Sequence, residues 1–154
     1  MRNVFLTVTA LLALSACQAA SPSITPASLA AQGAKPLTGP QIKALVSDRT
    51  IYGEFTIDYR RRHAGSSWSE YYYPDGTYYY KDSTRPFRGR WTVEGDTICY
   101  FEQDAKGCSE VQKIGETVYW VYVTADRYQG KVITRSTRIV PGDPDQLRQS
   151  ISTP

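Results

Sequence analysis

The stretch YYYPDGTYYY, Tyr71 to Tyr80, places three tyrosines on each side of a Pro-Asp-Gly turn. Pro74 suits position i+1 of a type I β-turn and Gly76 suits position i+3, so the stretch predicts a tight hairpin. Tyrosine is a strong strand former, which makes both arms of this hairpin β-strands. Because alternate strand residues face opposite sides, the six tyrosines and Trp68 cannot all be core. Some of them must line a cavity or lie on the outer face.

The same period of two continues on both sides of this hairpin. Apolar residues alternate with polar ones over 51–59 and 87–94, a pattern typical of half-buried strands. Gly95-Asp96 suits a two-residue type II′ turn, in which glycine takes the positive φ. With this loop, Val93 faces Ile98 across the hairpin, and the apolar sides of both strands agree.

One helix is predicted before the strands. Thr38 as N-cap and Gln41 three residues later form a capping box, which predicts a short helix that ends near Asp48. Further strands are expected at 67–73, 77–81, 108–114, 117–123 and 131–140. About eight short strands with close turns predict a mainly β fold, an antiparallel up-and-down meander. We expect it to form a small barrel or rolled sheet, with the one short N-terminal helix covering one end.

The N-terminus carries the most specific signal in the chain. Met1-Arg2-Asn3 is a short basic start, residues 4–14 are an apolar run too brief to span a bilayer, and Leu14-Ser15-Ala16-Cys17 follows. This layout is typical of a secretory signal peptide, and its end resembles the lipobox of bacterial lipoproteins. The resemblance implies that residues 1–16 are removed and that Cys17 carries a diacylglyceryl group and palmitate. An ordinary signal peptide with a stray cysteine is the alternative.

The residue after the lipobox cysteine bears on sorting. Lipoproteins with Asp at this position tend to be held in the inner membrane, whereas this chain has Gln18. The resemblance therefore implies an anchor in the cell outer membrane, with the protein on the periplasmic side. Two or three acyl chains would hold it stably, because each buried CH₂ contributes about 0.8 kcal/mol.

Composition divides the rest of the chain. Residues 17–36 are rich in Ala, Ser, Pro, Thr and Gly and predict a flexible tether that begins at the lipidated cysteine. Residues 37–140 carry the strand patterns and suffice for one small β-domain. Residues 141–154 are expected to form a flexible tail.

Cysteine usage agrees with export. Once Cys17 is assigned to lipid, Cys99 and Cys108 remain in a chain sent to an oxidising compartment, and we expect them to form one disulfide. A zinc site is the alternative, but this spacing without CxxC pairs, in a chain with one histidine, is poor zinc chemistry.

Charge and motifs disfavour two functional classes, nucleic-acid-binding proteins and enzymes. The formal net charge of +3 falls to +2 after residues 1–16 are removed, because Arg2 is lost, so nothing favours a nucleic-acid partner. The sequence contains no G-x-S-x-G elbow, HExxH helix, P-loop or dinucleotide fingerprint. The lone His63 lies in a loop-like setting beside three arginines, where a solvated residue is the simpler interpretation. We therefore predict a protein that is not an enzyme and has no metal or cofactor.

Among five carboxylates, two could form a catalytic pair in space of the kind that glycoside hydrolysis requires. Surface strand positions explain them more simply. They are Glu54, Asp58, Glu70, Glu94 and Asp96.

A candidate contact surface combines the tyrosine hairpin with nearby arginines. Aromatic side chains supply contact area at low entropy cost, and arginine pairs with anions in a bidentate manner. An envelope glycan, a lipid headgroup or a protein would be the partner, and a solvated arginine loop is the simpler alternative. The proposed ligand-binding residues are Arg61, Arg62, Trp68, Tyr72, Tyr78 and Tyr80.

Three patterns together resemble small exported proteobacterial domains of unknown function. They are L-T-G-P-Q-I-K-A-L, Y-Y-P-D-G-T-Y, and G-R-W-T-V-E-G-D-T-I-C with a second cysteine downstream, within residues 37–123. A weaker likeness is to small-barrel periplasmic protease inhibitors, whose N-terminal segment enters the protease; here residues 18–35 would play that part. We therefore expect a non-catalytic binding or envelope-structural lipoprotein, with an inhibitor of a periplasmic or host hydrolase as the alternative.

Replacing the lipobox cysteine tests the anchor. Cys17→Ala is expected to abolish incorporation of an alkyne-labelled palmitate, because the thiol that would carry the acyl groups is gone. In-gel fluorescence after click labelling measures this, and equal labelling of wild type and variant would contradict the prediction.

Overall fold

The computed structural model describes residues 23–103 and 105–152. The predicted signal peptide (1–16), Cys17 and residues 18–22 of the predicted tether lie outside these ranges. Three helices and nine strands follow one another along the described chain. They are α1 (Pro26–Ala31), β1 (Lys35–Pro36), α2 (Gly39–Val46), β2 (Arg49–Phe55), β3 (Ser67–Tyr72), β4 (Thr77–Asp82), β5 (Phe87–Glu94), β6 (Thr97–Glu102), β7 (Ala105–Ile114), β8 (Thr117–Tyr122), β9 (Val132–Pro141) and α3 (Leu147–Ser152).

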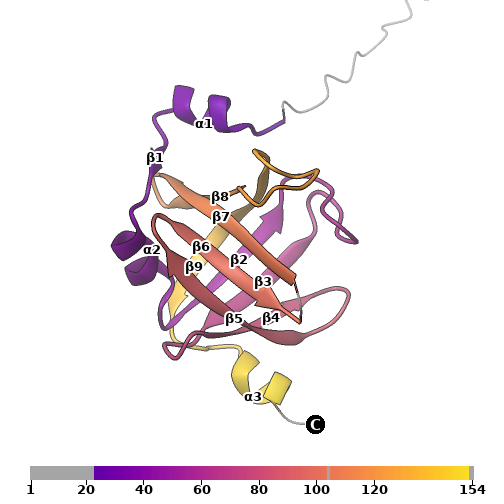
Figure 1. The fold of residues 1–154 in the computed structure, drawn as a ribbon. Coiled ribbons are helices and arrows are strands. Elements are labelled where there is room, and N and C mark those ends of the chain that lie inside the picture. Colours follow the sequence, from indigo (N-terminus) through magenta and orange to yellow (C-terminus); the bar gives the residue numbers. More distant parts are fainter. Residues whose placement is uncertain (1–22, 104, 153–154) are drawn as a thin grey trace, which may run out of the picture.

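The sheet is a closed antiparallel barrel (Figure 1). Strands β2 to β9 pair in chain order, each with the next, and β9 pairs back onto β2. The short strand β1 is an addition to these eight, and it pairs with Gln112 and Lys113 of β7. The predicted up-and-down meander is confirmed, in its closed form.

Local turn chemistry sets the register of two hairpins. Gly95 has a φ of 58°, and Val93 pairs with Ile98 across the Gly95-Asp96 loop, as predicted. At the tyrosine hairpin the Gly76 N–H donates to the carbonyl of Tyr73 at 3.1 Å, which is the bond of a β-turn. Both loops therefore use the residues that their geometry demands.

Helix α2 closes one end of the barrel. Thr38 and Gln41 form the predicted capping box, with Pro in the first turn. The apolar face presents Ile42 and Val46, both fully buried, to the same core as Ile98. This end of the barrel is filled by aliphatic side chains.

The segment predicted to be a flexible tether is structured from residue 24 onward. A capping box at Thr25 begins α1, and Leu29 is buried against Val121 and Val132 on the outer wall of β8 and β9. Leu29 thus packs a segment with the composition of a linker onto the barrel.

The predicted flexible tail also contains a docked helix. Asp143 accepts hydrogen bonds from the N–H groups of Leu147 and Arg148 and so begins α3. Leu147 is buried between Tyr71 and Tyr79 on the outer face of β3 and β4. Figure 1 shows α3 beside the barrel wall, close to the C-terminus.

The tyrosine hairpin divides its aromatic side chains as its alternation requires. Tyr72, Tyr78 and Tyr80 belong to the interior cluster, whereas Tyr71 and Tyr79 point outward and are covered by α3. Most of the motif therefore serves the fold on both sides of one wall.

Cys99 and Cys108 form a disulfide between directly paired positions of β6 and β7, with 4.0 Å between their Cα atoms. The disulfide predicted from the sequence is confirmed.

Removing the apolar contact of α3 is expected to destabilise the barrel. Leu147→Ala should lower the free energy of unfolding by about 2–4 kcal/mol, because a fully buried leucine side chain is lost and a cavity is left under the helix. Lys81→Ala, at an exposed position of β4, is the control and should change it by less than about 0.5 kcal/mol. Urea denaturation followed by tryptophan fluorescence measures both, and equal midpoints would show that α3 does not stabilise the domain.

Candidate ligand-binding cavity

The inward-facing side chains of the barrel leave a cavity of about 140 Å³ at the end opposite α2. Its wall is mostly aromatic. The aromatic lining residues are Phe55, Tyr59, Trp68, Tyr72, Tyr78, Tyr80, Phe87, Tyr100, Trp120 and Tyr122. Four charged residues, Arg60, Arg62, Glu70 and Glu102, complete the wall with Ala105, Gly107, Ser109, Ile133 and Thr134.

Burial shows where the cavity opens. Tyr72 lies deepest among the lining residues, with none of its surface exposed, whereas Arg60 and Ala105 are exposed to solvent. The mouth therefore lies between the loop after β2 and the start of β7.

A glycine lets one wall of the cavity form. A Cβ at Gly53 would lie 2.3 Å from the indole ring of Trp68, which is too close for any side chain. The register of β2 against β9 shifts between Tyr52 and Gly53, as at a β-bulge. The ring of Trp68 therefore lies directly against the backbone of β2.

Arg62 is held in place from one side. Its Nε donates to Asp82 Oδ2 at 2.9 Å, and the hydroxyl of Tyr80 donates to the same oxygen at 2.9 Å. Burial alone would raise the pKa of Asp82, but hydrogen bonds from Thr84, Arg62 and Tyr80 outweigh it and hold this pKa well below its usual range. Asp82 thus stays charged and fixes the guanidinium over the ring of Tyr80, 5.3 Å from its centroid.

Arg60 lies at the tip of a tight turn. Tyr59 and Arg62 exchange backbone hydrogen bonds of 2.9 Å, and Arg60 between them has a φ of 55°. Its N–H donates to the hydroxyl of Tyr128 at 2.7 Å, and its guanidinium lies 5.3 Å from the ring centroid of Tyr59. No carboxylate in the described ranges forms an ion pair with it.

Glu70 is the buried acid of the cavity. The hydroxyl of Tyr72 donates to its Oε2 at 2.9 Å and lies 2.8 Å from the hydroxyl of Tyr100. Burial raises the pKa of Glu70 to about 8, although the hydrogen bond from Tyr72 and the charge of Arg62 oppose the shift. Below that pH the carboxyl is predominantly protonated and is itself a hydrogen-bond donor.

Three further donors belong to residues that line the cavity. The indole N–H groups of Trp68 and Trp120 and the hydroxyl of Tyr122 make no well-formed hydrogen bond within the described residues, although the three residues are only 6%, 4% and 4% exposed. The hydroxyls of Tyr100 and Tyr59 lie close enough to Trp120 and Tyr122 to interact with them without satisfying them fully. Buried polar groups in native proteins are nearly always hydrogen-bonded, so a cluster of three exceptions requires an explanation.

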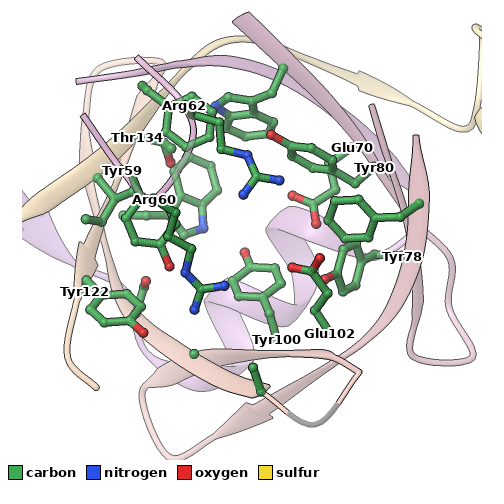
Figure 2. A pocket seen from close by; sticks show the side chains of 18 of the residues that line it. Tyr59, Arg60, Arg62, Glu70, Tyr78, Tyr80, Tyr100, Glu102, Tyr122 and Thr134 are labelled. Carbon is green, nitrogen blue, oxygen red and sulfur yellow. The ribbon is translucent and has the colours of Figure 1, made fainter. Parts of the chain in front are cut away.

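Figure 2 shows how the charged groups converge. The guanidinium groups of Arg60 and Arg62 and the carboxylates of Glu70 and Glu102 point toward the middle of the cavity. The carboxylate of Glu102 also accepts from Arg85 at 3.0 Å.

Five of the six residues proposed from the sequence line this cavity: Arg62, Trp68, Tyr72, Tyr78 and Tyr80. Arg61 does not; it is exposed and lies outside the lining. The sequence-based list did not include Glu102 or Tyr100, and from the run of three arginines it took Arg61 and Arg62 but left out Arg60. Glu70 was expected on the surface, whereas its carboxyl is buried. Trp68, Glu70 and Tyr72 alternate along β3 and so share one face of the strand. This pattern could have identified Glu70 as an inward-facing residue.

The remaining candidates lie on the surface. His63 has 87% of its side chain exposed and lies 3.7 Å from Asp58. Glu54 and Glu94 form ion pairs with Arg135 and Lys106. Asp96 accepts a hydrogen bond from the N–H of Gly39.

Residues 23–103 and 105–152 contain no group of three or more His, Cys, Asp or Glu side chains arranged to hold a metal ion. None of the helices in these ranges has the length and hydropathy to cross a membrane. Comparison of the chain with protein-family models, with curated proteins and with solved structures found no match.

The buried acid predicts a pH-dependent stability. Its pKa rises from an ordinary value of 4.5 to about 8 on folding, so the folded state keeps a proton that the unfolded state releases. This contribution is fully present below about pH 4.5 and is lost as the pH rises through about 8. The slope for one proton reaches about 1.4 kcal/mol per pH unit.

The substitution Glu70→Gln isolates this effect, because glutamine has no proton to lose. The free energy of unfolding of Glu70→Gln minus that of wild type is expected to grow as the pH is raised from about 5 to about 8. Urea denaturation of both proteins at several pH values measures this difference. A constant difference would show that Glu70 does not titrate differently in the folded state.

Proposed function

We propose that this chain is an exported, lipid-anchored and non-catalytic binding protein whose barrel holds a small ligand. The observation that carries the proposal is the set of buried donors on Trp68, Trp120 and Tyr122, which make no well-formed hydrogen bond within the described residues and all belong to the lining of one cavity. A buried donor without a partner costs about 1–3 kcal/mol, and a ligand with acceptor atoms would remove that cost.

The size of the cavity limits what it can hold. A volume of about 140 Å³ is smaller than the pockets of drug-sized ligands, which start at about 300 Å³, and close to that of a cavity that binds benzene. The aromatic wall offers ring faces and edges to a flat molecule. We therefore propose a ligand about the size of one six-membered ring with a short substituent.

The polar groups of the cavity support binding over catalysis. The hydroxyls of Ser109 and Thr134 donate to no carboxylate or histidine in the described part of the chain, so neither has the base that activates a nucleophile. The carboxyl of Glu70 is occupied by Tyr72, and Arg62 by Asp82. Fixed hydrogen-bond donors in an aromatic cavity are typical of ligand-binding sites.

The lipid anchor would keep this cavity close to a membrane. Between Cys17 and Leu29, whose side chain is packed on the barrel, the chain can span at most roughly 40 Å. With Gln18 after the lipobox cysteine, we propose the periplasmic face of the outer membrane as the location.

The same packing of Leu29 bears on the inhibitor alternative. An inhibitory segment over residues 18–35 would have to leave the barrel and enter a protease, yet its second half includes α1, which packs on β8 and β9. This observation favours the cavity over the N-terminal segment as the binding site.

Ligand-observed NMR tests the cavity directly. Saturation-transfer spectra of single-ring compounds (phenol, benzyl alcohol, benzoate, benzylamine and indole) are recorded with the mature chain carrying Cys17→Ala. At least one compound is expected to receive saturation. Ala105→Phe should remove that signal, because it places a ring at the mouth of the cavity.

The adjacent residue provides the matched control. Lys106 lies next to Ala105 on β7, forms a surface ion pair with Glu94 and does not line the cavity, so Lys106→Phe should leave the signal unchanged. No saturation of any compound, or equal saturation with Ala105→Phe, would overturn the proposed binding cavity.

A further inference from the structure

The charges around the cavity do not cancel. Arg62 is compensated by Asp82, and Glu102 by Arg85. Arg60 faces the same cavity and forms no ion pair within the described ranges, although its side chain points inward (Figure 2). With Glu70 neutral, the lining has an excess of one positive charge.

The hydrogen-bonding groups of the cavity, like its charges, favour an anionic ligand. Indole nitrogens donate and do not accept, and arginine carries only donors. The buried donors on Trp68, Trp120 and Tyr122 therefore add to the two guanidinium groups of the wall, which also contains the carboxyl groups of Glu70 and Glu102. The cavity is matched to a ligand rich in acceptor oxygens.

Aromatic walls alone would also suit a cation, because ring faces attract positive charge. Here three of those faces are already used by protein cations: Arg62 lies over Phe55 and Tyr80, and Arg60 lies over Tyr59. A cationic ligand in a cavity of about 140 Å³ would be close to both guanidinium groups. Like-charge repulsion therefore disfavours a cationic ligand.

We infer that the ligand of the cavity is a small ring-sized organic anion, such as an aromatic carboxylate, whose charged oxygens are bound by Arg60 and Arg62. This inference rests on the proposed binding function. It is supported by the fixed turn of residues 59–62, because two backbone hydrogen bonds and the Tyr128 hydroxyl fix the backbone of both arginines before a ligand enters. Asp82 holds the guanidinium of Arg62, and that of Arg60 lies over the ring of Tyr59. Pre-organised cations lose little entropy on binding.

Glu70 adds a pH dependence to this site. The charged and titratable groups that share the cavity with it are Arg62 from the loop after β2, Tyr72 from β3, Tyr78 and Tyr80 from β4, and Tyr100 and Glu102 from β6. Of these, Arg62 stays charged and the pKa values of the tyrosines are all raised by burial. Deprotonation of Glu70 above about pH 8 would place a negative charge beside the bound anion.

A charge series of nearly equal shape tests the inference. Benzoate, benzyl alcohol and benzylamine are titrated against the mature Cys17→Ala chain at pH 7, with NMR shifts and tryptophan quenching as readouts. Benzoate is expected to bind about tenfold more tightly than benzyl alcohol, the effect of one charge-assisted hydrogen bond, and benzylamine most weakly.

Neighbouring arginines supply the matched pair of variants. Arg60→Gln is expected to lower the affinity for benzoate about tenfold and to leave the affinity for benzyl alcohol unchanged. The unchanged affinity also shows that the variant is folded. Arg61→Gln removes the same charge from a side chain outside the cavity and should change neither affinity.

The role of Glu70 is tested by pH. Between pH 7 and pH 9 the affinity for benzoate should fall in wild type but not in Glu70→Gln.

The outcomes separate the two proposals. Binding of benzyl alcohol or benzylamine as tight as that of benzoate, or equal losses in Arg60→Gln and Arg61→Gln, would overturn the anion while leaving the binding cavity in place. If none of the three compounds binds to wild type and the wider set of rings also fails, the binding function itself is wrong.

Discussion

The closed hydrogen-bond ladder is the constraint on which the rest of this structure depends. Once β9 pairs with β2, each strand residue faces either the interior or the outside, and the chain has more large aromatic residues than the interior holds. The outward Tyr71 and Tyr79 would expose a broad apolar surface, so α3 covers them, as α1 covers part of β8 and β9. The positions of both terminal helices thus follow from closure of the sheet.

Closure also allows an interior that is polar at one end. In a barrel the backbone groups of the wall are paired with neighbouring strands, so the wall does not depend on complete filling of the inside. Aliphatic packing under α2 stabilises one end, and the Cys99–Cys108 disulfide links two neighbouring strands. The other end can therefore accommodate the buried carboxyl of Glu70 and donors without well-formed hydrogen bonds. Each of these opposes folding, and such groups cluster at sites that bind or react.

Much of the fold could be predicted from the sequence because its signals are local. The Pro-Asp-Gly and Gly-Asp turns set hairpin registers, alternation identified the strands, and the spacing of Cys99 and Cys108 matched a hairpin. The helices α1 and α3 were missed because each has six residues and is held by one buried leucine, a long-range contact that composition does not show. Alternation likewise placed tyrosines on two faces, but it did not show that Glu70 would lose its solvation.

The two arginines at the mouth show why the candidate site was only partly predictable. In the run Arg60-Arg61-Arg62 composition is uniform, and the difference between lining and solvent-exposed residues arises from the turn, in which Arg60 has a positive φ and Tyr59 pairs with Arg62. That geometry turns the first and third side chains inward and leaves Arg61 in solvent. Ligand selectivity would then depend on two separate parts of the structure. The aromatic wall limits the size of the ligand through packing, and Arg60 and Arg62 of the turn determine which ligand charge is favoured. A change in the conformation of the turn would therefore alter the preferred ligand charge without altering the barrel.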